Sequence, residues 1–543
     1  MRANPLRRPL HLLMAFALVT SQLMLLAPST AVAAPTISVD STGDDPDFNP
    51  GDGICGTTNG GGTCTLRAAI QEANASTSVD EIHFDIPGAS GATHVIEPLS
   101  VLPWITSPVS IDATTQAGYS GAPLIVVDGS SAPPIADGPD AFMVDADDVV
   151  ITGFEIRDWH DDGVELHGDR SVVTANHIYN NDEGVLTEDG DDNLIGGLVS
   201  ADRNVISGNR VGISIHDGIG NQILGNYVGT DASGTGAIAN QESGVYLWSS
   251  ARDVRIEGNV ISGNTRHGVF VDHASHVTVA DNRVGTNAAG TSAVPNRDDG
   301  INVTNGHEVW IGPGNVISGN GDGDGDHGVQ LEEAATEVEI FGNRIGTDGS
   351  GASAVPNARN GVHADADAVL IADNQVSGNG EDGLRLEQQG AVVRGNLIGT
   401  DSAGTGPLPN GDDGIDTGSG TTGSDIGGVD PGEGNVIAFN VDDGIVLRNH
   451  PGTQAAIVSN SIFGNGGLGI DLLGDGVTAN DYTPTIDGDT GPNDLLNHPE
   501  IDLAAAAEGT IYTQFDLPVP DGHYRIEFFV SPLRCRSLRA RRG

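Results

Sequence analysis

A short pattern of apolar and polar positions recurs along most of the chain. It consists of a glycine, an aliphatic residue, any residue and usually a second aliphatic residue. Apolar side chains that alternate every second residue predict β-strands with one face in a core. The pattern starts at Gly163, Gly184, Gly212, Gly244, Gly268, Gly300, Gly328, Gly361, Gly383, Gly414, Gly444 and Gly469. Because it returns every 21 to 33 residues, it predicts a solenoid in which each repeat supplies one rung.

No long helical pattern separates the predicted strands. Strands stacked in one column without helical crossovers are parallel only if the chain winds as a coil. We therefore expect an all-β parallel β-helix (solenoid) of about twelve or more turns over residues 101–485. Asparagines recur at the bends, where their amides can satisfy backbone groups and stack as an internal ladder. They are Asn209, Asn264, Asn320, Asn379, Asn440 and Asn465.

Long repeats alternate with short ones in the middle of the chain. Each long repeat carries an insertion that begins Gly-Thr-Asp or Gly-Thr-Asn and ends in an asparagine eleven residues past its glycine. The insertions run from Gly229 to Asn240, from Gly285 to Asn296, from Gly346 to Asn357 and from Gly399 to Asn410. We expect four equal loops on one side of the solenoid, one on every second turn.

The two ends of the chain lack the repeat. Residues 34–100 are expected to form an N-terminal cap with one short helix, Leu66–Asn74, which Thr65 can N-cap. Residues 486–543 contain strand patterns typical of part of a β-sandwich, followed by an arginine-rich tail. Our hypothesis is that a truncation or a frameshift cuts this last domain short.

Charge and targeting signals restrict the function. Residues 1–33 combine three arginines, a long apolar run and a small-residue cleavage site, which together are typical of a secretory signal peptide. Later apolar segments are too short for a membrane span. The net charge of −51 disfavours nucleic acid and anionic lipid as partners but permits divalent cations. We expect a secreted or cell-surface protein in which Cys55 and Cys64, nine residues apart, form a disulfide.

The repeats described above resemble those of the right-handed parallel β-helix proteins of the pectate-lyase-like superfamily. The segment Cys64-Thr65-Leu66-Arg67-Ala68-Ala69 also resembles the CSLREA-type N-terminal domain that often precedes such repeats. It differs at Thr65, where that motif has serine, and at Ala68, where it has glutamate. The resemblance implies a right-handed solenoid but no single chemistry, because this fold carries lyases, hydrolases, epimerases and adhesins.

Strand alternation also predicts which side chains face outward. The second and fourth residues after each repeat glycine point away from the core, and neighbouring rungs lie about 4.8 Å apart. One outward cluster is aromatic in a chain with only 4% aromatic residues: Tyr246, Trp248 and Phe270, with His216 and Asp272 beside them. Flat rings next to polar groups suit the binding of sugar rings. The alternative is that a loop folds over the rings and buries them.

A second outward cluster is charged and extends over successive rungs. It holds Gln330, Glu332, His363, Asp365, Arg385, Glu387 and Asp416. Its metal candidates are Glu332, Asp365 and Glu387, which could hold Ca²⁺ against an acid group of the substrate. Arg385 or His363 would then abstract the proton alpha to that group. The cluster predicts a lyase or an epimerase, although any acidic solenoid surface forms such clusters by chance.

Acidic pairs precede three consecutive strands and are expected to stack on one another. Their second members are Asp382, Asp413 and Asp443. Like charges one rung apart repel, and a bound cation would relieve the repulsion, so calcium is the candidate cofactor. The alternative is a set of solvated turn aspartates without an ion.

These observations favour an exported protein that binds a polysaccharide or cell-surface glycan without catalysis. The second hypothesis is a calcium-dependent polysaccharide lyase or epimerase that acts on an acidic glycan. The third is a structural or adhesive spacer. No oligomeric state is predicted.

Overall fold

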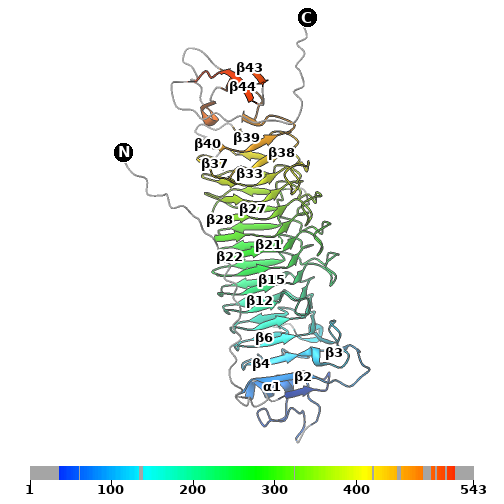
Figure 1. Ribbon diagram of the computed structural model, residues 1–543. Coiled ribbons are helices and arrows are strands. Elements are labelled where there is room, and N and C mark those ends of the chain that lie inside the picture. Colours follow the sequence, from blue (N-terminus) through cyan, green and yellow to red (C-terminus); the bar gives the residue numbers. More distant parts are fainter. Residues whose placement is uncertain are drawn as a thin grey trace, which may run out of the picture.

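The computed structural model shows a long solenoid (Figure 1). The described residues are 36–59, 62–76, 78–133, 139–322, 325–418, 421–448, 454–480, 491–495, 498–507 and 510–519. The predicted signal peptide, residues 1–33, and the arginine-rich tail lie outside them. Within the described part of the chain, no helix is long and apolar enough to cross a membrane.

Each turn of the solenoid adds one strand to each of three sheets. The first sheet contains β1 (Thr36–Val39), β2 (Asp80–Phe84), β4 (Val109–Asp112), β7 (Val150–Thr152), β10 (Val172–Thr174), β13 (Leu194–Gly196), β16 (Gln222–Leu224), β19 (Arg255–Glu257), β22 (Ser275–Ala280), β25 (His307–Ile311), β28 (Thr336–Phe341), β31 (Leu370–Ala372), β34 (Val392–Arg394), β37 (Ser424–Gly427) and β40 (Ala455–Val458). The second sheet contains β3 (His94–Ile96), β5 (Ile125–Asp128), β8 (Phe154–Arg157), β11 (His177–Tyr179), β14 (Val205–Ile206), β17 (Tyr227–Val228), β20 (Val260–Ile261), β23 (Arg283–Val284), β26 (Val316–Ile317), β29 (Arg344–Ile345), β32 (Gln375–Val376), β35 (Leu397–Ile398), β38 (Val436–Ala438) and β41 (Ser461–Phe463). The third sheet contains β6 (Phe142–Val144), β9 (Val164–Leu166), β12 (Glu183–Glu188), β15 (Val211–His216), β18 (Val245–Trp248), β21 (Val269–Asp272), β24 (Ile301–Thr304), β27 (Val329–Leu331), β30 (Val362–Ala364), β33 (Leu384–Leu386), β36 (Ile415–Thr417), β39 (Ile445–Arg448) and β42 (Ile470–Leu473). Within each of these sheets neighbouring strands are parallel, which confirms the predicted parallel β-helix.

The core is a set of aliphatic columns, one lining the inside of each sheet. From Gly163 to Gly444, residues one and three positions after the repeat glycines are buried as predicted; Val245 and Leu247, for example, are fully buried, whereas Ile470 in the last repeat is exposed. Parallel pairing keeps equivalent residues in register, with Val245 opposite Val269. Each rung therefore buries its apolar side chains against the rungs on either side, which is the main source of stability in a solenoid.

Two ladders of buried asparagines follow the bends. In the first ladder, each side-chain amide donates to the side-chain oxygen of the next member at 2.8–3.4 Å. Its members are Asn181, Asn209, Asn240, Asn264, Asn296, Asn320, Asn357, Asn379, Asn410, Asn440 and Asn465. The sequence predicted six of them, and the asparagines that end the four insertions occupy rungs between those six. A second ladder of the same kind runs from Asn176 to Asn460.

The four insertions stack into a ridge along the solenoid. Each is closed by an antiparallel bridge, such as that between Thr230 and Ala237. The backbone N–H of Ala288 in the second loop donates to the carbonyl of Gly234 in the first at 2.8 Å, and equivalent bonds join the later loops. The insertions therefore form equal loops on alternate turns, as predicted.

The N-terminal segment continues the solenoid. β1 and β2 pair in parallel and extend the first sheet beyond β4, so the stacked strands begin earlier than the predicted boundary at residue 101. The helix α1 (Leu66–Ala75) lies at this end of the solenoid (Figure 1), and the Thr65 hydroxyl accepts a hydrogen bond from the N–H of Ala68 at 3.0 Å. Cys55 and Cys64 form a disulfide.

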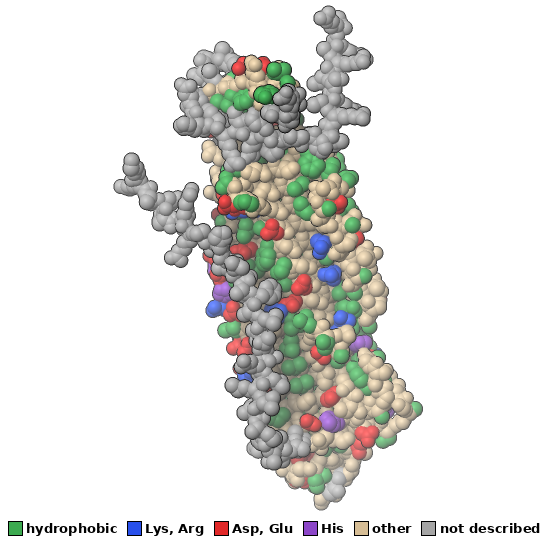
Figure 2. All heavy atoms as spheres, viewed as in Figure 1, with side chains coloured by type: hydrophobic (Ala, Val, Ile, Leu, Met, Phe, Trp, Pro, Cys, Tyr) green, Lys and Arg blue, Asp and Glu red, His purple; other side chains and the backbone are tan. Residues whose placement is uncertain are grey.

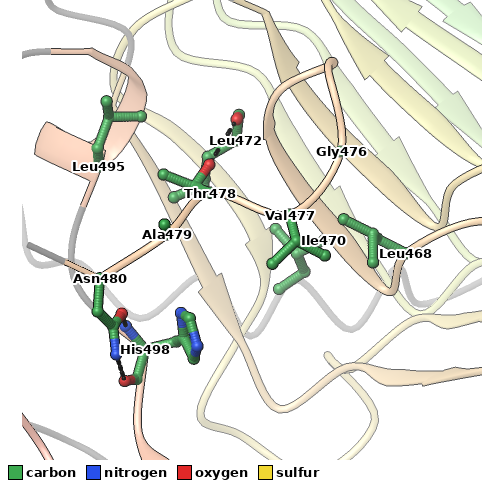
Figure 3. A pocket seen from close by; sticks show the side chains of 10 residues that line it. All are labelled: Leu468, Ile470, Leu472, Gly476, Val477, Thr478, Ala479, Asn480, Leu495 and His498. Atoms are coloured by element: carbon green, nitrogen blue, oxygen red, sulfur yellow. Dashed lines mark hydrogen bonds between the residues drawn. The ribbon is translucent and has the colours of Figure 1, made fainter. Parts of the chain in front are cut away.

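The C-terminal end carries an antiparallel strand pair, β43 (Glu500–Ala507) and β44 (Thr510–Asp516). The remaining strand predicted for this segment lies outside the described residues, and the β-sandwich stays a prediction. A largely apolar pocket lies against β42 (Figure 3), lined by Leu468, Ile470, Leu472, Gly476, Val477, Thr478, Ala479, Asn480, Leu495 and His498. In the part of the chain that the structure describes, the short 3₁₀ segments η1 (Ala113–Thr115) and η2 (Gly129–Ser131) lie outside the sheets, as does the turn η3 (Pro492–Leu495), in which Asn493 and Asp494 have positive φ.

Candidate functional site

The outer face of the third sheet carries the residues predicted to bind sugar and to perform catalysis. Its strands pair in register, so Ser214 lies beside Tyr246 and His216 beside Trp248. Equivalent outward positions therefore form columns along the solenoid, with rungs about 4.8 Å apart. On the side of the molecule seen in Figure 2, acidic side chains recur along the length of the solenoid.

The predicted aromatic residues form one continuous stack, here called the ring ladder: His216, Trp248, Tyr246 and Phe270. Ring centroids are 4.3 Å apart for His216 and Trp248, 6.3 Å for Trp248 and Tyr246, and 5.0 Å for Tyr246 and Phe270. The planes of these pairs differ by only 9° to 13°. Trp248 is 44% exposed and the other three rings are half-buried, so the alternative of complete burial beneath a loop is wrong.

Asp272 lies beside the ring ladder at the end of β21. Its carboxylate accepts a hydrogen bond from Asn305 Nδ2 at 3.0 Å and lies 2.6 Å from His273 Nδ1. Burial raises the pKa of the Tyr246 hydroxyl, and the charge of Asp272 adds to this effect. The five residues predicted to bind sugar therefore come together on β15, β18 and β21.

A third column on this face, which we call the leading column, consists of the residue directly before each repeat glycine. The sequence analysis recognised only three of its members, Asp382, Asp413 and Asp443. Its polar members are all buried: Asp162, Glu183, Ser243, His267, Asp299, His327, Asn360, Asp382, Asp413 and Asp443. Carboxylates of this column accept the backbone N–H of the next rung, as Asp162 does from Glu183 at 2.9 Å. The sequence feature that predicts this column is the acidic residue that often stands directly before the repeat glycine.

Three buried carboxyl groups meet near the N-terminal end of this face. Oxygens of Asp140, Asp162 and Glu165 lie within 4.8 Å of one another. Burial, reinforced by the charge of Glu183, raises the pKa of Asp162 to about 10. Burial also raises the pKa of Asp140 and of Glu165 to about 7. Asp162 therefore keeps its proton near neutral pH and can act as a proton donor.

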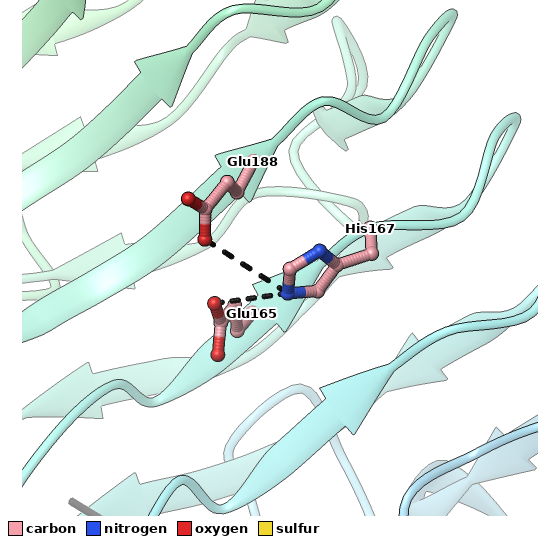
Figure 4. Close-up of side chains that lie close together, drawn as sticks. All are labelled: Glu165, His167 and Glu188. Carbon is pink, nitrogen blue, oxygen red and sulfur yellow. Dashed lines mark hydrogen bonds and ion pairs between the residues drawn. The ribbon is translucent and has the colours of Figure 1, made fainter. Parts of the chain in front are cut away.

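His167 and Glu188 adjoin Glu165, one of these three carboxyl groups (Figure 4). His167 Nε2 lies 3.0 Å from Glu165 Oε1 and 4.0 Å from Glu188 Oε2. Glu188 Oε1 lies in turn 3.6 Å from His216 Nδ1. Since His216 stacks on Trp248, an unbroken line of contacts joins the acidic residues to the ring ladder.

The structure corrects the role predicted for Arg385. Its Nη1 donates to Asp416 Oδ2 at 2.5 Å and its Nε to Glu387 Oε1 at 2.6 Å. Burial lowers the pKa of this guanidinium, but the charges of Asp416 and Glu387 outweigh burial and leave the pKa above its ordinary value. A cation held in this way cannot accept a proton. Arg385 is instead an ion-pair partner of the buried Asp416, which Arg448 also binds.

The His363 side chain can act as a base. Its Nδ1 lies 2.7 Å from Gln330 Oε1, an oxygen that can only accept. Burial lowers the pKa of His363 below its ordinary value, so the ring is neutral near pH 7. With the proton on Nδ1, Nε2 is the accepting nitrogen.

The stacked aspartates predicted to hold calcium have structural partners. Asp382 accepts the backbone N–H of Asp413 at 3.1 Å, Asp413 that of Asp443 at 2.8 Å, and Asp443 that of Leu468. Burial raises the pKa of Asp382 and of Asp413 to about 7. Oxygens of Asp382, Asp412 and Asp413 do meet within 4.8 Å. The backbone donors and partial protonation nevertheless relieve the repulsion on which the prediction of calcium depended.

The other three predicted metal ligands, Glu332, Asp365 and Glu387, do not converge. Asp365 accepts a hydrogen bond from Gln388 Nε2 at 2.8 Å, and Glu387 is paired with Arg385. Among the residues that the structure describes, none of the three belongs to a group of ligand atoms that meet within 4.8 Å. The predicted calcium site on these rungs therefore lacks a common centre.

Comparisons with known proteins found one family model and several solved structures similar to this chain. A family model described as periplasmic copper-binding protein (NosD) matches residues 235–360 and 291–482, which lie within the repeats. No curated protein matches the chain in sequence. The chain is similar in structure to the Dettilon tailspike protein gp208, with 13% identity, a TM-score of 0.43 and coverage of 65% of this chain and 64% of that one.

Two further solved structures are similar to parts of this chain. One is the catalytic unit of the GH87 α-1,3-glucanase of Streptomyces thermodiastaticus, with 15% identity, a TM-score of 0.43 and coverage of 80% of this chain and 69% of that one. The other is the A-module of the Azotobacter vinelandii mannuronan C-5 epimerase AlgE4, with 16% identity, a TM-score of 0.32 and coverage of 76% and 94%. These likenesses concern the fold alone.

Proposed function

We propose that the protein binds a polysaccharide along the outer face of the third sheet, with the ring ladder as its platform. The observation that carries this proposal is the stack of nearly parallel rings that includes the exposed Trp248. Aromatic faces attract the C–H faces of sugar rings, and the nearby carboxylates of Glu188 and Asp272 can accept hydrogen bonds from sugar hydroxyls. Export by the predicted signal peptide would bring this face to extracellular or cell-surface glycans.

The charge of this face favours a neutral glycan. The chain carries a net charge of −51, and Glu188 and Asp272 flank the ring ladder. Arg385 and Arg448, farther along the sheet, are already paired with Asp416. An acidic glycan at the ring ladder would therefore meet charges of its own sign.

Replacing Trp248 by alanine tests the proposal. The loss of one stacking ring should cost about 1.4 kcal/mol of binding free energy, which corresponds to a tenfold weaker affinity for the glycan. Trp310→Ala is the matched control, because Trp310 lies on β25 of the first sheet and stacks on His276 with centroids 6.2 Å apart. Equal affinity in the two variants, measured by titration calorimetry with a neutral glycan, would contradict the proposal.

A second candidate function, a lyase or epimerase, is favoured by the neutral His363 and its bond to Gln330. In this version His363 Nε2 removes the proton alpha to the acid group of a uronate. His363→Gln would then abolish the ultraviolet absorbance of unsaturated products from pectate or alginate, or the epimerisation of alginate, whereas Trp310→Ala would not. Wild-type protein that gives no product with either polymer, with or without Ca²⁺, would exclude this candidate.

A further inference from the structure

We propose that Glu165, His167 and Glu188 form a binding site for a divalent transition-metal ion, with Zn²⁺ as its probe. One ligand atom of each residue lies within 4.8 Å of the others, and the three side chains point toward one another in Figure 4. None of the three residues belongs to the ring ladder, although Glu188 lies next to it, 3.6 Å from His216 Nδ1.

The types of ligand atom at this site indicate which metal ion it binds. One imidazole and two carboxyl groups supply the nitrogen and oxygen ligands that Zn²⁺ takes, and Zn²⁺ binds three protein ligands and leaves a position for water. Ca²⁺ instead takes six to eight oxygens. The side chains of His167 and Glu188 are 33% and 38% exposed, so an ion and its water can reach the site from solvent.

Neighbouring residues hold the three ligands in place. Glu165 lies on β9, and His167 directly follows the end of this strand, two residues farther along the chain. Glu188 follows on the next rung, where His216 Nδ1 lies 3.6 Å from it. The His216 ring is fixed by stacking on Trp248, and its Nε2 lies 3.5 Å from Asp217 Oδ2. Contacts of this kind orient the ligands in metal sites.

A second group with the same composition provides an internal comparison. His307, Glu308 and Glu337 also bring ligand atoms within 4.8 Å of one another. However, His307 and Glu337 are exposed, and Glu308 forms a closer ion pair with His276. The competing pair leaves this group less able to bind an ion, so it serves as the control.

Calorimetric titration of the untagged, chelator-treated full chain with Zn²⁺ tests the proposal. We expect one equivalent of Zn²⁺ to bind and to raise the melting temperature. His167→Gln and, independently, Glu188→Gln should weaken binding by at least about tenfold, and His307→Gln should bind as the wild type does. Both altered ligands are partly exposed, so the variants are expected to fold.

Three results would overturn the assignment. They are a wild-type chain that binds no Zn²⁺, binding that survives both His167→Gln and Glu188→Gln, and binding that His307→Gln removes. A chain that takes Ca²⁺ in preference to Zn²⁺ would equally contradict the donor argument. None of these results depends on glycan binding, which is measured separately with Trp248→Ala.

Discussion

Removing one member of the first asparagine ladder should destabilise the solenoid strongly, although the residue touches no ligand. Asn320 is 1% exposed. Its Nδ2 donates to Asn357 Oδ1 at 3.0 Å and to the carbonyl of Val284 at 3.2 Å, and its Oδ1 accepts from Asn296 Nδ2 at 2.9 Å. Asn320→Ala deletes all three hydrogen bonds.

The expected loss of stability follows from the number of hydrogen bonds that the substitution deletes. A buried hydrogen bond contributes about 1 kcal/mol net, so Asn320→Ala should lower the free energy of unfolding by about 3 kcal/mol. Asn320→Asp should cost at least as much, because a carboxylate would face the acceptor oxygens of Asn357 and Val284. The exposed Asn59 gives a control, Asn59→Ala, which should change stability by less than about 0.5 kcal/mol.

Amide hydrogen exchange and guanidinium denaturation can both measure this effect. Local opening of β26 and β29, the strands that lie beside Asn320, should become about a hundredfold more frequent in Asn320→Ala. Strands near α1 should exchange as before, because the rungs of a solenoid interact mainly with their neighbours. If Asn320→Ala behaved like Asn59→Ala in both assays, the view that the ladder stabilises the bends would be refuted.

Two further predictions concern charged groups on the outer face. Burial holds the pKa of Asp162 at about 10 in the folded chain against 3.8 ordinarily, so the folded state binds the extra proton and stability falls as the pH rises from about 4 to 10. The denaturation midpoint of the wild type should therefore be lower at pH 8.5 than at pH 5, and Asp162→Asn should reduce this difference. An equal difference in the variant would contradict the raised pKa of Asp162. Arg385→Ala should lower the free energy of unfolding by about 2 kcal/mol, because the buried Asp416 loses one charged partner, yet leave glycan affinity unchanged. Lost affinity with unchanged stability in urea denaturation would restore Arg385 as a functional residue.

The fold could be predicted because its signal is local. The aliphatic residues after glycines such as Gly244 and Gly268 occupy one column, and a period of two is enough to orient them. The ladder could be predicted only in part. Asn240 and Asn296 end insertions of unusual length, and only the folded loops show that they return to the same bend as Asn264.

The site was predictable where alternation held and not where the backbone turns. Tyr246 and Phe270 have equivalent positions in successive repeats, so their contact follows from the register. Asp162 precedes a glycine at the bend, where a period of two does not assign its face. Arg385 and Asp416 likewise occupy equivalent positions in successive repeats, but the alternation does not show that Arg385 binds Asp416 and Glu387 together.

The most direct test of the central claim is a titration of a panel of neutral and acidic polysaccharides into the wild-type chain, Trp248→Ala and Trp310→Ala. We predict that the wild type binds at least one neutral glycan, that Trp310→Ala binds it equally well, and that Trp248→Ala binds it about tenfold more weakly. Failure of the wild type to bind any glycan, or the same affinity in Trp248→Ala and Trp310→Ala, would contradict the account.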